Sequence, residues 1–344
     1  MRSRINIFTV MSIGIFAFGL EPIVHEILGH AVVCWLTGGK VILISSTALQ
    51  TASASRLVPA AGPLANILFG LAALALLRFL TTQQNANARA QTGVRANTTA
   101  AAPAAFGVPR ISLSLTLLFL YFFAFANLFL ATGYILYSGL INFGDLAAVI
   151  NGLRPAWLYR AALVIIGALG YRYGIAQAAH CLAQLLARAH TPPASETAAS
   201  PLPASPLSSA QQSSPPALPL PSAQQSPPLP APPISLPAAR RIIRTACFAG
   251  GALFFLSSFL NPISPSLILY DGLSGAIGLT LGFFLALTDL RQSAAKSSTL
   301  APQGSVPQPL AAEIEVPFHL ALTITAAIFA AAFLIFMGKG IRLP

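Results

Sequence analysis

Hydrophobic residues along this chain gather into long runs that contain almost no charged residues, with shorter polar stretches between them. Uncharged runs cover residues 57–77, 111–144, 245–270, 272–288 and 316–338, and two runs with a few polar residues cover 5–36 and 161–187. Runs of this length suit the ~20 residues that an α-helix needs to cross a bilayer. The pattern predicts an all-α, polytopic integral membrane protein with six or seven transmembrane helices. The run 111–144 predicts a helix followed by a bend or a re-entrant piece.

The composition agrees with a membrane protein. Of the 344 residues, 55% are hydrophobic and only 8% are charged, against roughly 25% charged residues in soluble domains. The net charge of +11 does not indicate a nucleic-acid partner, because the basic residues are scattered at the ends of the hydrophobic runs. A cytoplasmic N-terminus places most of them on the cytoplasmic side, as the positive-inside rule favours. We therefore expect a multi-pass protein of the cell membrane or an inner membrane, with a cytoplasmic N-terminus.

A proline-rich stretch divides the chain into two blocks. Residues 191–238 hold more than half of the chain's 28 prolines, with Ser, Ala and Gln between them. Such a segment cannot bury a core and forms an extended, disordered spacer. It separates a membrane core at 1–190, with about four helices and a polar loop at 81–110, from a C-terminal block at 239–344. The C-terminal block is expected to have about three helices and a polar loop at 291–315.

A cluster of ionisable residues lies inside the first hydrophobic run, in the sequence His25-Glu26-Ile27-Leu28-Gly29-His30. Ionisable side chains at membrane depth are costly and mark functional sites. Histidine and glutamate together suit a zinc ion and the base that activates its water. In an α-helix, residues four apart share one face, but these histidines are five apart, which separates them by about 140°. A π-bulge would bring them onto one face, and Gly29 is the natural place for that distortion.

The same segment leaves two other arrangements open. Glu21 with His25, and Glu26 with His30, have the four-residue spacing that places two side chains on one helix face. A metal could then be held by Glu26 and His30, while His25 has another role. Alternatively, His25, Glu26 and His30 satisfy one another by hydrogen bonds inside a helix bundle.

A third metal ligand is expected at Asp145. This acidic residue follows a long uncharged stretch, and an acidic side chain there needs a partner. Its alternative interpretation is the N-cap of an interfacial helix after Gly144. Asp271 is a second candidate ligand, and its other interpretation is a residue at a helix end between two membrane spans.

The motif and the sequence after it resemble a known family. Residues 25–31 with Thr37-Gly38-Gly39-Lys40 behind them, and then Ala60-Ala61-Gly62-Pro63-Leu64-Ala65-Asn66, resemble the site-2-protease type of intramembrane zinc metallopeptidase. The resemblance covers roughly residues 15–150. It departs from the family in the extra residue between the histidines and in Gly-Asp where the family has Asn-Pro-Asp-Gly.

The resemblance implies a set of roles. One zinc ion per chain would be held by His25, His30 and Asp145, and Glu26 would be the general base. Asn66 and Asn127 would hydrogen-bond the backbone of the substrate, although each could equally join helices as a packing residue.

Three functions follow from these observations. The first is a zinc-dependent endopeptidase that cuts membrane-embedded or membrane-proximal segments of other membrane proteins. The second is a catalytically inactive scaffold on the same fold that binds partner helices, which the extra motif residue favours. The third is a transporter whose intramembrane His, Glu and Asp line a pathway, but the sequence has no matched inverted repeats.

Overall fold

The computed structural model describes residues 4–52, 55–96, 110–188, 235–262, 272–299 and 313–343. Most of the described chain is helical. The helices and π-helices (η) are α1 (Ile7–Pro22), η1 (Ile23–Ala31), α2 (Val32–Leu36), α3 (Leu57–Ala96), α4 (Leu115–Ile141), α5 (Asp145–Ile150), α6 (Ala156–Arg188), α7 (Leu236–Phe259), α8 (Ser274–Thr299), α9 (Leu320–Phe333) and η3 (Leu334–Gly338). The strands are β1 (Arg4–Ile5), β2 (Lys40–Ile44), β3 (Leu49–Ala52), β4 (Arg110–Ser112), β5 (Glu313–Val316) and β6 (Ile341–Arg342).

Six helical segments among the described residues are long and apolar enough to cross a membrane. They are Ile7–Leu36, Leu57–Gln84, Leu115–Ile141, Ala156–Ala187, Leu236–Phe259 and Leu320–Gly338. The chain is therefore a multi-pass α-helical membrane protein, as the hydrophobic runs predict. The expected span at 272–288 corresponds to α8, which is also a long helix but is not one of the six.

Helix boundaries follow the local sequence. The side chain of Asn6 accepts a hydrogen bond from the Thr9 N–H at the start of α1, and Ser114 caps α4 in the same way through Leu117. Such side chains satisfy backbone N–H groups that have no partner within the helix. Pro237 lies in the first turn of α7, where a missing N–H costs nothing. The helix therefore begins inside the segment 191–238 that the composition assigns to the spacer, and the rest of that spacer lies outside the described residues.

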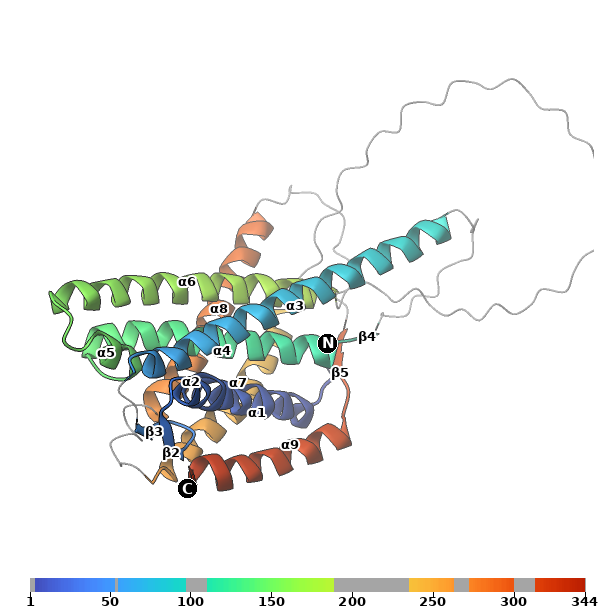
Figure 1. The fold of residues 1–344 in the computed structure, drawn as a ribbon. Coiled ribbons are helices and arrows are strands. Elements are labelled where there is room, and N and C mark those ends of the chain that lie inside the picture. Colours follow the sequence, from blue (N-terminus) through green and yellow to red (C-terminus); the bar gives the residue numbers. More distant parts are fainter. Residues whose placement is uncertain are drawn as a thin grey trace, which may run out of the picture.

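Helix α4 is at the centre of the bundle. It packs against α1, α3, α6 and α8, and Figure 1 shows it between α1 and α6. The largest fully buried side chains include Tyr121, Phe122, Phe125 and Phe129 of α4 and Phe283 of α8. Because α8 follows the spacer and α4 precedes it, the two sequence blocks share one hydrophobic core.

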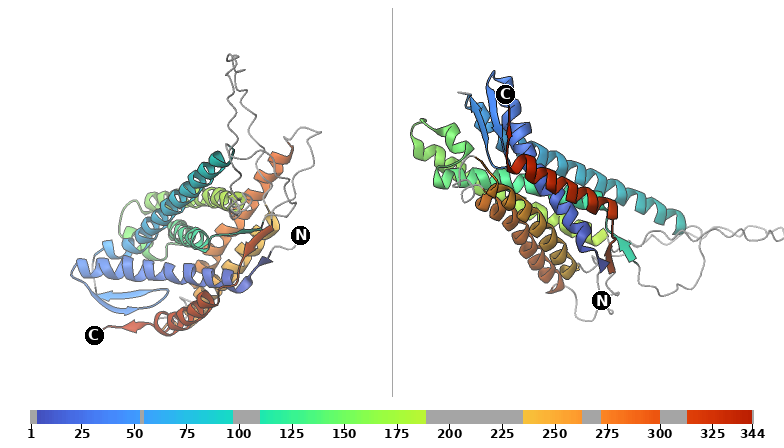
Figure 2. Two further views of the ribbon diagram at one scale, coloured as in Figure 1. Left: turned by 90° about the vertical axis from the view of Figure 1, so that its right-hand side faces the viewer. Right: turned by 90° about the horizontal axis from the view of Figure 1, so that it is seen from below.

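Two small sheets lie at opposite ends of the bundle (Figures 1 and 2). One has the strand order β1-β5-β4, with parallel pairing, and gathers the starts of α1, α4 and α9. The other has the order β3-β2-β6, with antiparallel pairing, and lies after α2 and η3. The second sheet and α5 are at the same end of the molecule in Figure 1, and this end carries the candidate site described below.

Two expected loop boundaries are wrong. The expected polar loop at 81–110 begins late, because α3 continues to Ala96. The residues after Thr81 are mostly Ala, Gln and Asn with no proline before Pro103, and alanine and glutamine favour a helix even on a polar surface. The expected loop at 291–315 also begins late, since α8 continues to Thr299. The run 111–144 begins within the strand β4 and continues as one helix, which ends in a turn before α5. This agrees with the expected helix followed by a bend.

Candidate metal centre

The five-residue spacing of the histidines is accommodated by a π-helix. Residues Ile23–Ala31 form η1 inside the first membrane span. A π-helix bonds residue i to residue i+5, so side chains five apart lie near one another. The rings of His25 and His30 are 4.7 Å apart between centroids. This confirms the predicted π-helical distortion.

Local sequence explains where the distortion occurs. Pro22 ends α1 immediately before η1, and its missing N–H removes one of the hydrogen bonds that would continue the α-helix. Gly29 lies within η1, and a Cβ at this position would be 2.6 Å from the Cα of Gly62 in α3. The two glycines let η1 and α3 approach closely. A Cβ at Gly62 would overlap the Nε2 atoms of both His25 and His30, so this glycine gives the two rings their room.

The turn after α4 places Asp145 beside the histidines. Asn142 ends α4 in the left-handed conformation, with φ 55°. Gly144 follows with φ 86°, a conformation that glycine adopts without strain. Asp145 is then the first residue of α5, and Gly144 is its N-cap. The alternative interpretation of Asp145 as an N-cap is therefore wrong.

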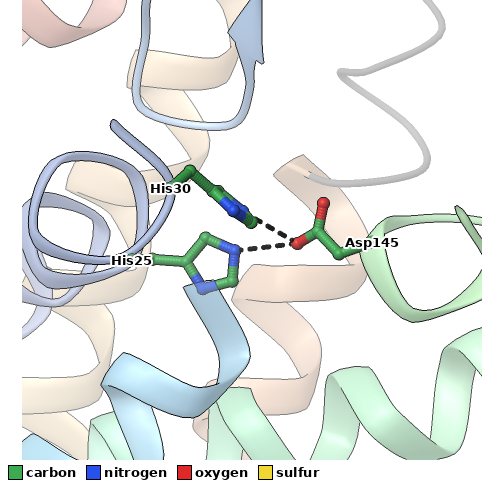
Figure 3. A group of neighbouring side chains, drawn as sticks. All are labelled: His25, His30 and Asp145. Carbon is green, nitrogen blue, oxygen red and sulfur yellow. Dashed lines mark hydrogen bonds and ion pairs between the residues drawn. The ribbon is translucent and has the colours of Figure 1, made fainter. Parts of the chain in front are cut away.

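Asp145, His25 and His30 converge on one point (Figure 3). The Oδ2 atom of Asp145 is 3.1 Å from His25 Nε2 and 3.0 Å from His30 Nε2. The three ligand atoms lie within 4.8 Å of one another, and the group could hold a metal ion. Burial alone would raise the pKa of the Asp145 carboxyl, but the neighbouring His30 and His25 hold that pKa well below its usual range. The Asp145 carboxyl is thus in its anionic form beside the two rings.

Backbone and side-chain groups behind the rings set their orientation. His30 Nδ1–H donates to the carbonyl oxygen of Val58, at 2.6 Å. Histidines that bind a metal commonly donate their second ring N–H to such an acceptor. The Nδ1 atom of His25 is instead 3.3 Å from the Nδ2 atom of Asn66, which donates to Glu21 Oε1 at 2.6 Å.

A cavity of about 460 Å³ opens over the group. Such a volume is within the range of small-molecule and substrate pockets. In addition to His25, His30 and Asp145, residues of α1, η1, the β2–β3 hairpin, the start of α3, α4 and α7 line the cavity. The wall residues include Glu21, Glu26, Ser46, Thr47, Leu49, Thr51, Val58, Tyr134, Phe143 and Phe254.

The remaining predicted site residues lie in different places. Glu26 is buried, with 4% exposure, and lines the cavity. Asn66 and Asn127 are fully buried and are not part of the cavity wall. Asn66 joins α3 to Glu21 of α1, and Asn127 donates to the Phe123 carbonyl of its own helix. Asp271 lies outside the described residues.

Sequence reasoning missed several residues around the group. Val58, Tyr134 and the hairpin residues 46–49 form part of the cavity wall, and the ring of Tyr134 meets that of His25 edge-on at 5.8 Å. Val58 contributes only a carbonyl oxygen, which no side-chain pattern can reveal. The sequence does not single out Tyr134 either, because Tyr121 and Tyr137 lie in the same helix.

Comparisons with known proteins add no family assignment: no family model, curated protein or solved structure matches this chain.

Proposed function

We propose that this protein is an intramembrane zinc-dependent endopeptidase that cuts membrane-embedded or membrane-proximal segments of other membrane proteins. The observation that carries the proposal is the convergence of His25, His30 and Asp145 on one point, with Glu26 in the wall of the same cavity. These residues come from two segments more than a hundred positions apart, and three of the four are buried and lie within a candidate membrane span.

The ligand set fits zinc. Two imidazoles and one carboxylate are typical of catalytic zinc sites, which keep a fourth position open. Bonds of about 2.0–2.1 Å in a tetrahedron separate the ligand atoms by about 3.3 Å. The observed separations of 3.0 and 3.1 Å from the carboxylate oxygen to the two Nε2 atoms differ from that value by a few tenths of an ångström. All three ligand atoms lie within 4.8 Å of one another, so side-chain adjustments would bring His25, His30 and Asp145 to the spacing that the ion needs.

Glu26 supplies the acid–base chemistry in this proposal. Bound zinc would provide a water molecule whose pKa is lowered towards about 7. Glu26 would accept the proton of that attacking water and then deliver it to the leaving amine nitrogen. A carboxylate in this role must be close to the reacting atoms and shielded from bulk water. Glu26 is buried in the protein and lines the cavity.

The part of the cavity wall that β3 forms suits an extended peptide. Strand β3 is at the edge of its sheet, and Leu49 and Thr51 of β3 line the cavity. An edge strand offers backbone groups with which an extended chain can pair. A protease needs its substrate in this extended form, because a peptide bond inside a helix is shielded by its own hydrogen bonding.

The alternative of an inactive scaffold has less support than the sequence suggested. Its main reason was the extra residue between His25 and His30, and η1 brings both rings to Asp145 despite that residue. The experiment below distinguishes the endopeptidase from the inactive scaffold.

The test is cleavage of a model membrane protein by the purified full-length chain in detergent or liposomes. The substrate carries a reporter on each side of one transmembrane segment with helix-breaking residues. We expect cleavage by the zinc-loaded protein, loss of cleavage with a chelator, and recovery on adding Zn²⁺. Glu26→Gln should retain the metal but cleave about 10²–10⁴-fold more slowly, which is the usual contribution of a general base.

The matched control is Asp289→Asn, which removes a carboxylate that pairs with Arg172 and does not line the cavity. It should leave cleavage unchanged. A zinc-loaded protein that cleaves no substrate, or a Glu26→Gln variant as active as the wild type, would contradict the proposal and favour the scaffold.

A further inference from the structure

Three polar side chains form a chain behind the metal group. Glu21 of α1 and Asn66 of α3 are both fully buried, and His25 is 6% exposed. The side-chain amide of Asn66 stands between the other two, with its Nδ2 atom 2.6 Å from Glu21 Oε1 and 3.3 Å from His25 Nδ1. Buried polar groups are kept in a membrane helix only where they have partners. This set of contacts therefore holds α1 and α3 together directly behind one of the ligands.

A metal on His25 Nε2 sets a requirement for the other ring nitrogen. Neutral imidazole carries one proton, so a ring that gives its Nε2 lone pair to a metal has its proton on Nδ1. That N–H needs an acceptor, as His30 has in the Val58 carbonyl. For His25, the neighbouring group is the Asn66 amide. Turning this amide by 180° about its last bond places Oδ1 where Nδ2 stands, so that it accepts the His25 Nδ1–H.

The turned amide also keeps the contact with Glu21. In the unturned amide, Oδ1 is buried without a hydrogen-bond partner. In the turned form, the Glu21 carboxyl donates its O–H to Asn66 Oδ1. The oxygen then accepts two hydrogen bonds, from Glu21 and from His25, which its two lone pairs allow.

We propose that Asn66, held by Glu21, is a positioning residue that fixes the His25 ring with Nε2 directed at the metal. This inference rests on the proposed metal site and gives Asn66 a role other than contact with the substrate. It also explains why a glutamate lies one helical turn before His25 without joining the metal group. Glu21 acts through Asn66 and neither residue binds the metal.

The test measures metal affinity, which does not require activity. Full-length protein in detergent is stripped of metal and titrated with Zn²⁺ against a chelating indicator, and with Co²⁺ followed by its visible absorption. Asn66→Leu and Glu21→Leu should each bind Zn²⁺ about 10–100-fold more weakly, the usual effect of removing a partner of a metal-binding histidine. The Co²⁺ spectrum should change, because the His25 ring is no longer held in one orientation.

Two variants separate this role from a general loss of packing. Asn127→Leu removes another fully buried asparagine, one that donates to its own helix, and should keep wild-type metal affinity. Glu21→Gln retains a donor for Asn66 and should bind Zn²⁺ within about threefold of the wild type. Thermal unfolding without metal identifies any variant that fails to fold. If Asn66→Leu does not fold, the difference in Zn²⁺ affinity between Glu21→Gln and Glu21→Leu tests the positioning role.

The outcomes are distinct. Wild-type affinity in Asn66→Leu and Glu21→Leu would overturn the positioning role while leaving the metal site intact. An equal loss in Asn127→Leu, or a loss in Glu21→Gln as large as in Glu21→Leu, would also overturn it. A wild-type protein that binds no metal would overturn the proposed function itself.

Discussion

The centre of the bundle and the end that carries the metal group are built in opposite ways. At the centre, regular α-helices bury aromatic rings, and Phe283 lies 5.2–5.8 Å from the rings of Phe18, Phe122 and Phe129 between centroids. At the metal end, each contributing segment departs from a regular helix: η1 is a π-helix, and Asn142 and Gly144 have positive φ. Buried polar groups are joined there by hydrogen bonds between helices.

The two regions are held in place by different kinds of contact. Apolar packing fixes the centre through shape, and a substitution there costs stability in proportion to the cavity it leaves. At the metal end, irregular backbone and glycine contacts fix the positions of a few polar atoms to within a bond length. Substitutions at the centre should therefore lower stability without changing metal binding. Substitutions at the metal end should lower metal affinity.

The largest effect is expected from Gly62→Ala. Its methyl group would overlap the Nε2 atoms of His25 and His30, so the rings must move away from Asp145. We expect at least a 100-fold loss of Zn²⁺ affinity, measured by competition with a chelator. Gly278→Ala is the matched control, because a Cβ at that helical position meets no heavy atom within 4 Å. A Gly62→Ala protein with unchanged affinity would show that the rings are not confined as described.

The second prediction concerns the centre. Phe283→Ala should lower the free energy of unfolding by about 2 kcal/mol. Helices that separate in a bilayer remain in an apolar environment, so transfer of the ring to water contributes little. The loss of stability therefore comes chiefly from the cavity that the substitution leaves. Unfolding in mixed detergent–denaturant solution measures this change. Metal content should stay at the wild-type value. If zinc were lost together with stability, the two regions would not be independent.

The smallest effect is expected from Asn261→Ala. Its side chain donates to the hydroxyl groups of Ser45 and Thr47, which connects the end of α7 to the turn of the β2–β3 hairpin. Two such bonds contribute about 1–2 kcal/mol together. We expect faster hydrogen exchange at residues 45–48, slower substrate cleavage and unchanged metal content. Unchanged exchange would mean that β6 and the hydrogen bond from the Ser46 N–H to the Met337 carbonyl hold the hairpin without Asn261.

Much of this arrangement could be predicted from the sequence. Charge-free runs identify membrane spans because a bilayer tolerates few charges, and six of the segments agree with the structure. The pair His25 and His30, their π-helical spacing and Asp145 could be found because ionisable residues are rare in apolar runs. Such residues stand out wherever the background is apolar.

Apart from the meeting of Asp145 with the two histidines, contacts between distant segments could not be predicted. The strands β2 and β3 lie in 40–52, where the residues alternate too weakly to identify a hairpin, and β6 joins them from the far end of the chain. Likewise, the Glu21–Asn66 contact depends on how α1 meets α3, which no pattern in either helix specifies. Asn66 could be seen as a polar residue in a membrane helix, but not as a neighbour of His25.

The most direct test of the central claim is the zinc content of the purified full-length protein, wild type beside His30→Ala and Asp145→Ala. These residues come from segments far apart in the sequence and meet only in the folded chain. Our account predicts about one zinc per wild-type chain and loss of that zinc in both variants, with each variant still folded. A wild-type protein that takes up no zinc when the ion is supplied, or variants that keep it, would contradict the account.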